Sequence, residues 1–330
     1  MNVARITAWA LARTPVRAFL RYSESRGPML ADSVTYRALF SIFAGVLLGF
    51  SIAALWLAGD PQAWGALVDA VDRAVPGLVG EGGLIDVDQI TAPAGLSIAG
   101  VVSLVGLVGA AIGAIGSLRL ALHAISETPT DDLAWYWVIL RNLALAIGVG
   151  VALGASAVIT VVGTAGIGIM AGAVGLRPDD PLIVFGGRSL AILVTFVLDA
   201  LAIAVLFRLL SGVRAPAKAL WTGAVLGAVG LTVLQTLSGL FVGGASANPL
   251  LASFATLIAL LLWMNLSSQV ILIASAYIVE STAEHSDRVR TRLGATTFTE
   301  RRVQRGEDAV RVAAAELETA REALAKEREG

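Results

Sequence analysis

One uncharged stretch of the chain is far longer than a soluble domain normally contains. From Ala219 to Val279, 61 residues contain no Asp, Glu, Lys or Arg, and shorter uncharged stretches run from Ala38 to Gly59 and from Asn142 to Leu176. Apolar runs longer than about 18 residues are typical of helices that cross a bilayer. A mean hydropathy of +0.79 and a charged fraction of 15% exclude an ordinary soluble domain. The sequence therefore predicts a polytopic membrane protein.

The apolar stretches divide into six predicted transmembrane helices of about 20 residues each. The 35-residue uncharged run from 142 to 176 must break, because as one helix it would extend about 52 Å across a hydrocarbon core of about 30 Å. Glycines from Gly163 to Gly175 and the turn residues GGASANP from Gly243 to Pro249 are the predicted breaks. The predicted spans are 35–58, 94–118, 137–163, 181–207, 219–242 and 249–279.

The distribution of basic residues predicts the orientation of the bundle. Lys and Arg are enriched in cytoplasmic loops of membrane proteins. With the N-terminus inside, the predicted cytoplasmic segments carry 21 basic residues, and the other side carries only 3, which are Arg73, Arg177 and Arg188. We therefore predict an all-α fold, a bundle of six transmembrane helices with both termini cytoplasmic.

The first thirty residues combine arginines with apolar side chains. Within 1–30, Arg13, Arg17 and Arg21 are interleaved with apolar residues, among them Trp9. This pattern is typical of an amphipathic helix that lies on the inner leaflet with its arginines near anionic lipid headgroups. We predict such a cytoplasmic N-terminal helix, with these three arginines in contact with lipid. A solvated arm without a lipid role is the alternative.

Two further parts complete the predicted organisation. Residues 31–280 form the six-span transmembrane domain, and residues 281–330 form a charged, partly helical cytoplasmic tail. Apolar residues recur every seven positions in the tail, at Val303, Val310, Leu317 and Leu324. The intervening positions of the repeat are too small or too polar for a strong coiled coil, and they are Gly306, Ala313, Ala320 and Glu327. A solvated tail is therefore predicted.

The side-chain chemistry of the chain argues against an enzyme. There is no cysteine, and the two histidines, His123 and His285, cannot make the usual zinc sets alone. No phosphate-binding loop of the form GxxxxGK[ST] occurs. A net charge of -1 gives no reason to expect nucleic acid as a partner. We predict no catalytic residue, no metal and no cofactor.

Polar residues inside the predicted spans form the candidate site. Asp199 lies nine residues before Arg208, about 13 Å from the cytoplasmic end of the fourth span and close to mid-membrane. Ionisable residues at that depth normally face the bundle interior and often mark a pathway. The candidate intramembrane polar site consists of Asp199, Gln235, Asn265, Ser268 and Gln269.

The roles of these polar residues depend on their neighbours. Asn265, Ser268 and Gln269 are spaced three and four residues apart, which places them on one helix face. For the amides, structural hydrogen bonding between helices and lining a substrate path are both open. For Asp199, handling of a proton or substrate competes with a structural ion pair. The arginines whose long side chains could reach the carboxylate are Arg37, Arg119 and Arg141.

Small residues at helical spacing occur in several spans. The pairs are Gly45 and Gly49, Gly109 and Gly113, Gly150 and Gly154, and Gly223 and Gly227. Because lipid provides no hydrophobic drive between helices, such residues predict close helix packing. Packing within one bundle is favoured over a dimer interface, and the sequence leaves the oligomeric state open.

Four stretches together resemble one family of bacterial inner-membrane proteins. They are TYRALFSIF at 35–43, ALHAI at 121–125, APAKALW at 215–221 and LLWMNLSSQVILIASAY at 261–277. In order and spacing they resemble the YihY/BrkB family over roughly 30–280. The chain departs from the family pattern at Ala44, where proline is usual, and at Ser275 to Tyr277, where the family often has glycine, alanine and glutamate. No role of that family glutamate can be transferred to this chain.

The resemblance implies a multi-pass protein of the bacterial inner membrane. The family is named after phenotypes such as serum resistance and is described in terms of transport or the cell envelope; some members carry a ribonuclease label. This chain has no cytoplasmic cluster of carboxylates or histidines that would support RNA hydrolysis with a metal. We predict that it moves, or helps to move, a small or amphiphilic envelope-related molecule without hydrolysing ATP. The alternative is a membrane scaffold in envelope assembly or stress and serum resistance.

Overall fold

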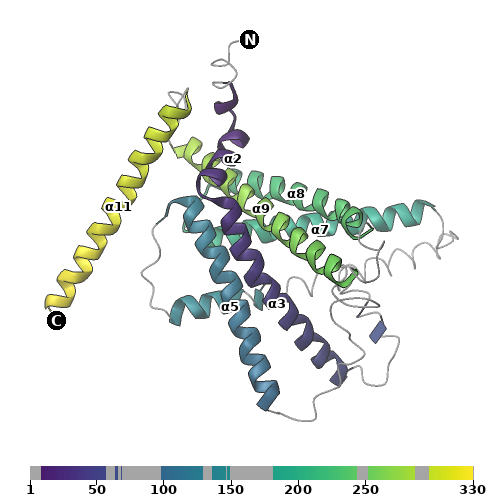
Figure 1. Ribbon diagram of the computed structural model, residues 1–330. Coiled ribbons are helices and arrows are strands. Elements are labelled where there is room, and N and C mark those ends of the chain that lie inside the picture. Colours follow the sequence, from purple (N-terminus) through teal and green to yellow (C-terminus); the bar gives the residue numbers. More distant parts are fainter. Residues whose placement is uncertain are drawn as a thin grey trace.

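The computed structural model describes residues 9–56, 64–65, 68, 98–128, 136–145, 147–148, 181–243, 252–286 and 297–329. Within these ranges the chain is helical and has no strand (Figure 1). The principal helices are α2 (Thr14–Glu24), α3 (Gly27–Trp56), α5 (Ile98–Ser126), α7 (Pro181–Leu210), α8 (Ala217–Gly243), α9 (Ala252–Ser286) and α11 (Phe298–Glu329). The predicted all-α fold is confirmed for the described residues.

Several of these helices have the length and composition of membrane spans. The four apolar segments are Val108–Ser126 of α5, Ile192–Leu210 of α7, Ala217–Leu237 of α8 and Leu257–His285 of α9. They coincide with the second, fourth, fifth and sixth predicted spans, so the chain is a multi-pass membrane protein. Helix α3 covers most of the first predicted span. Of the third, 137–163, only residues up to 145 and 147–148 are described.

Two helices continue beyond their predicted spans. Helix α5 ends at Ser126 rather than near 118, and α9 ends at Ser286 rather than near 279. In α5 the extra residues include Leu122 and Ile125, whose side chains are almost fully buried. The predicted spans end at the first charged residue after each apolar stretch, whereas packing continues these helices past that residue.

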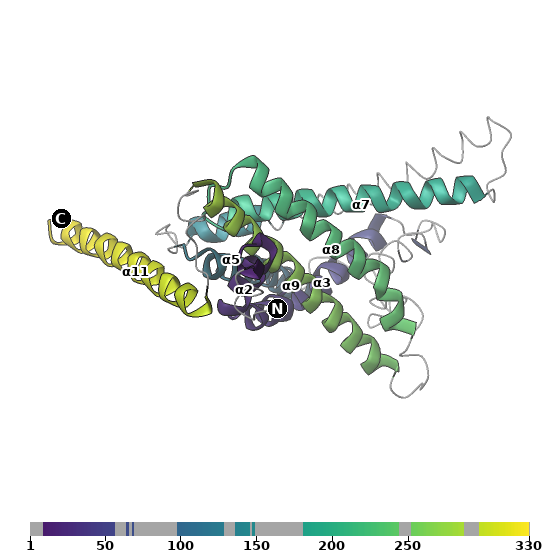
Figure 2. The same cartoon turned by 90° about the horizontal axis from the view of Figure 1, so that it is seen from above.

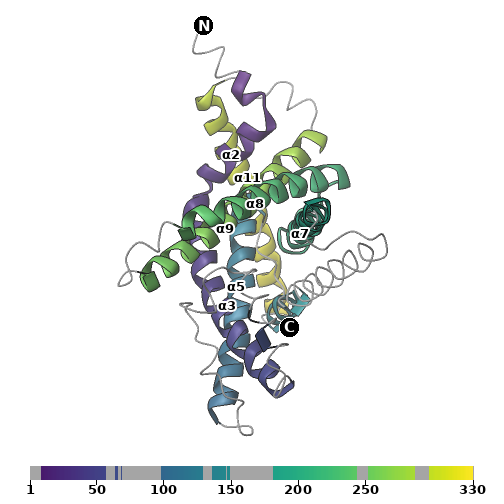
Figure 3. The same cartoon turned by 90° about the vertical axis from the view of Figure 1, so that its right-hand side faces the viewer.

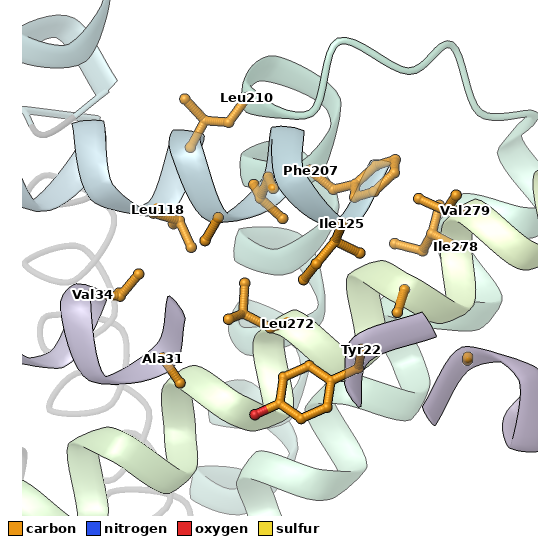
Figure 4. Close-up of a cluster of buried hydrophobic side chains, with 14 of the residues drawn as sticks. Tyr22, Ala31, Val34, Leu118, Ile125, Phe207, Leu210, Leu272, Ile278 and Val279 are labelled. Carbon is orange, nitrogen blue, oxygen red and sulfur yellow. The ribbon is translucent and has the colours of Figure 1, made fainter. Parts of the chain in front are cut away.

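The helices converge at one end of the bundle. The ends of α5, α7 and α9 meet the beginnings of α3 and α8 there, and α2 packs against α9. Figures 1 and 3 show α3 and α5 running side by side away from this end, while α7 and α8 extend in another direction (Figure 2). The apolar side chains at this junction are drawn in Figure 4 and include Tyr22, Ile125, Phe207, Leu210, Leu272 and Ile278.

Glycines bring α8 close to its neighbours. A Cβ on Gly227 would lie 2.6 Å from Cδ1 of Ile203 on α7 and 2.8 Å from Cβ of Ala274 on α9. A Cβ on Gly223 would overlap the Ile278 side chain and lie 3.1 Å from the Ala274 carbonyl oxygen. Close packing at this pair is therefore present as predicted. Small residues allow such close backbone approach.

Gly227→Ala is expected to destabilise the bundle, whereas Gly109→Ala is not. The added methyl at 227 meets α7 and α9, and overpacking of this kind costs about 1–3 kcal/mol. At Gly109 no atom lies within 4 Å of the added Cβ, so the higher helix propensity of alanine dominates. Thermal unfolding of both variants in detergent measures the difference. Equal melting temperatures would show that the close approach at Gly227 does not limit stability.

Candidate functional site

Asp199 forms a polar contact between α7 and α8. Nε2 of Gln235 donates a hydrogen bond to Oδ2 of Asp199 at 3.2 Å, and both side chains are half-buried. Asp199 lies eleven residues before the last residue of α7, which corresponds to about 16 Å along the helix. In the described part of the structure the carboxylate is therefore paired with a neutral amide, and no ion pair joins it to an arginine.

A second polar group joins α3 to α9. Nε2 of Gln269 donates to Oδ1 of Asn265 at 2.6 Å, and Nδ2 of Asn265 donates to Oδ1 of Asp32 at 2.7 Å. Beside this series of hydrogen bonds, the hydroxyl oxygens of Thr35 and Ser268 lie 3.3 Å apart. The expected shared face of the three α9 residues is thus used for contact with α3. Asp32 was not among the predicted site residues.

The five predicted polar residues therefore form two groups rather than one. Asp199 and Gln235 lie between α7 and α8, whereas Asn265, Ser268 and Gln269 lie against α3. Each group contains one carboxylate held by the amide of a neighbouring helix. Sequence spacing could not reveal this division, because it depends on which helices are neighbours in space.

The three predicted partner arginines occupy other places. Nη1 of Arg37 lies 3.7 Å from the position that a Cβ of Gly113 would take, which is an ordinary contact distance, so Arg37 packs beside Gly113 on α5 and no helix approaches closely there. Arg119 is buried on α5 with 8% of its surface exposed. Arg141 lies in the helical segment 136–145, beside the buried Asn142. Nδ2 of Asn142 lies 3.6 Å from the position that a Cβ of Gly116 would take, so this side chain packs beside α5.

A buried ion cluster lies where the helices converge, around Glu280 near the end of α9. Oε1 of Glu280 lies 2.8 Å from Nε of Arg21 and 3.6 Å from Nη2 of Arg301, and Oε2 lies 3.3 Å from Nε of Arg17. The Glu280 side chain is only 10% exposed. We call these four residues the Glu280 cluster. It connects α2, α9 and α11.

Further contacts surround the Glu280 cluster. Arg17 pairs with Glu284, whose carboxylate also accepts from Thr14 at 2.8 Å. Arg21 donates to the Ile125 carbonyl at the end of α5 at 3.1 Å. Burial lowers the pKa of the Arg21 guanidinium, but the nearby carboxylates, Glu280 first and then Glu127 and Asp308, together more than offset this, so the pKa is raised above its ordinary value. Arg21 therefore stays charged. The ion pairs of the Glu280 cluster hold α2 against α9 and α11.

A family model described as Virulence factor BrkB matches residues 18–296. The chain belongs to this family. A search of curated proteins found no match, and a search of solved structures found none either. The BrkB match includes both polar groups and Glu280, and it ends before α11 begins. The resemblance noted from the four sequence stretches is confirmed.

In this BrkB-family chain the N-terminal arginines make protein contacts that the sequence interpretation missed. Arg17 and Arg21 face Glu284 and Glu280, whereas Arg13 is exposed and lies with its guanidinium 5.0 Å from the ring centroid of Trp9. The spacing of these charged residues could have predicted the contacts. The arginines are four residues apart, as are the glutamates, so antiparallel helices can match them pairwise.

A hydrogen-bonded contact at His123 lies at the end of the bundle where the helices converge. Nδ1 of His123 lies 2.9 Å from Oγ1 of Thr128, which donates to the Ser211 carbonyl at 3.0 Å. Gly212 has a φ of 71°, and a Cβ there would lie 3.3 Å from Cε1 of His123. This contact joins the end of α5 to the connection between α7 and α8.

Proposed function

We propose that this BrkB-family protein moves, or helps to move, a small or amphiphilic envelope-related molecule across or within the bacterial inner membrane, without hydrolysing ATP and without a catalytic centre. The observation that carries the proposal is the pairing of Asp199 with Gln235. A carboxylate near mid-membrane costs roughly 2.5–3.5 kcal/mol on insertion scales, so such a residue usually has a function. Because its partner is neutral, the carboxylate keeps its capacity to take up a proton or bind a cationic group.

The second polar group supports the same proposal. Asp32, Asn265 and Gln269 present a carboxylate and two amides along the contact of α3 with α9. Amides both donate and accept hydrogen bonds, so they suit a polar headgroup or solute as well as each other. Two such groups on different helix pairs provide successive polar contacts for a molecule that crosses an apolar bundle.

Uptake or efflux in reconstituted vesicles tests the proposal. Purified protein is placed in vesicles and screened against panels of lipids and small solutes, with empty vesicles as the control. The proposal expects at least one compound to cross or change leaflet only when the protein is present. If no compound moves, the result favours the alternative function, a membrane scaffold that does not transport.

The scaffold is the second candidate function, and the Glu280 cluster favours it. Arg301 at the beginning of α11 contacts Glu280, and Arg301 also pairs with Glu24 at 3.5 Å. These contacts anchor the tail helix to the membrane domain, which suits docking of other proteins. In this case the polar groups serve only to hold helices together.

We also propose six spans with both termini cytoplasmic. The excess of basic residues on one predicted side supports this topology. So do contacts that bring α2, the end of α5 and the beginning of α11 to one end of the bundle. Reporter fusions at Glu81 and Ala247 should report an outside location, and one at Gly330 an inside location. An outside location for Gly330 would contradict six spans.

A further inference from the structure

Helix α11 carries an exposed apolar stripe. The exposed fractions are 57% for Val303, 69% for Val310, 53% for Leu317 and 47% for Leu324. Residues seven apart lie on one side of a helix, and the 32 residues of α11 span about 48 Å. Figures 1 and 2 show α11 projecting from the bundle, with its beginning nearest to the other helices. The helix lies beyond residue 296, where the family match ends.

We propose that the stripe pairs with the same stripe of a second copy of this chain, in antiparallel orientation. The positions three residues after Val303, Val310 and Leu317 are small, namely Gly306, Ala313 and Ala320, whereas Glu327 follows Leu324. In a parallel pair, small residues would face small residues and leave gaps. An antiparallel pair sets Val303, Val310 and Leu317 against the three small residues, and close packing favours that arrangement.

The register of this pairing follows from the sequence. When Val310 of one copy faces Ala313 of the other, Val303 faces Ala320 and Leu317 faces Gly306. In an antiparallel dimer, the heptad position that flanks the seam on one helix lies beside the same heptad position of the other helix. In this register Glu307 of one copy lies beside Arg321 of the other, and two-fold symmetry repeats the pair. Both residues are exposed in the single chain, so they are available for this contact.

Charge argues against a lipid surface as the occupant of the stripe. Helix α11 contains 7 basic and 8 acidic residues, so an anionic membrane would not attract it. The apolar stripe is also one residue wide, as in a helix seam, and narrower than the face of a membrane-surface helix.

Cysteine crosslinking tests the pairing, because the native chain has no cysteine. Full-length Val303→Cys and Ala320→Cys chains with different tags are reconstituted together and oxidised mildly. A disulfide between the two tagged chains is expected. Neither variant alone should crosslink, since its two copies would lie about 26 Å apart along the helices. Ala315→Cys, on the opposite side of α11, is the control and should form no disulfide between chains.

Two outcomes of the crosslinking would overturn the proposal. Crosslinking of Val303→Cys with itself would show a parallel pair, and absence of any crosslink between the mixed chains would exclude this register. A fluorophore at Leu317→Cys that is quenched by a lipid-borne quencher would place the stripe in the bilayer instead.

A charge exchange tests the flanking contact. Glu307→Arg and Arg321→Glu should each weaken dimerisation by about fivefold, because each places like charges together at both symmetric positions. The double variant should restore the wild-type dissociation constant, measured by energy transfer between labelled copies in vesicles. Recovery would not occur if the two substitutions acted only on the helix itself. Failure of the double variant to recover would contradict the proposed register.

Discussion

Asp199→Asn is expected to reduce the cellular activity of the protein at least tenfold while its abundance and melting temperature stay near those of the wild type. Asparagine has nearly the same shape, and its side-chain oxygen can accept the hydrogen bond that Gln235 donates at 3.2 Å. A neutral amide is also easier to place in the bilayer than a carboxylate. The substitution therefore removes only the charge and the ability to exchange a proton.

Complementation of a deletion strain measures this effect, with immunoblots of membranes to report abundance. Gln235→Leu is the matched variant, because it removes the donor and keeps the carboxylate; it is expected to lower stability as well as activity. Normal complementation by Asp199→Asn at normal abundance would remove Asp199 from any mechanism. The carboxylate would then be a hydrogen-bonded interior residue.

Glu280→Gln is expected to lower the free energy of unfolding by about 3 kcal/mol. Loss of the carboxylate leaves Arg17, Arg21 and Arg301 close together without their shared partner. Breaking a buried ion pair by removing one side costs about 3–5 kcal/mol, and we take the lower figure because the arginine side chains keep 15–18% exposure. Unfolding in detergent and the steady-state membrane level measure the loss.

Glu284→Gln is the control for this prediction. Its carboxylate contacts Arg17 and Thr14, but the side chain is 29% exposed. Partly exposed pairs contribute about 1 kcal/mol or less. Equal losses in the two variants would show that burial does not distinguish Glu280 and would contradict the special role of the Glu280 cluster.

The helices could be predicted from the sequence because an uncharged run longer than a membrane's thickness has few alternatives. The helix break predicted between Gly243 and Pro249 agrees with the end of α8 at Gly243 and the beginning of α9 at Ala252. The extension of α5 to Ser126 was missed, since the run criterion stops at Arg119 while packing of Leu122 and Ile125 continues.

Contacts between distant segments were harder to predict. The same small-residue spacing accompanies close helix packing at Gly227 but not at Gly113, where the nearest atom to an added Cβ is Nη1 of Arg37 at an ordinary contact distance of 3.7 Å. The neighbouring helix decides which case applies. Likewise, an arginine beside a membrane can bind a lipid headgroup or a carboxylate, and Arg21 forms an ion pair with Glu280. Residue types thus identified Asp199 as a candidate, whereas its partner depended on the arrangement of α7 and α8.

Accessibility of position 199 to water shows whether a polar path reaches Asp199. Single-cysteine variants Asp199→Cys and Val197→Cys are treated in vesicles with a charged, thiol-specific reagent that requires a hydrated thiolate. Val197, on the same helix, is 54% exposed on the outside of the bundle and serves as the lipid-facing control. A transport path predicts modification at 199 and none at 197. Lack of modification at 199, with normal labelling of a cysteine at Ala247, would show a dry interior and contradict transport through this site.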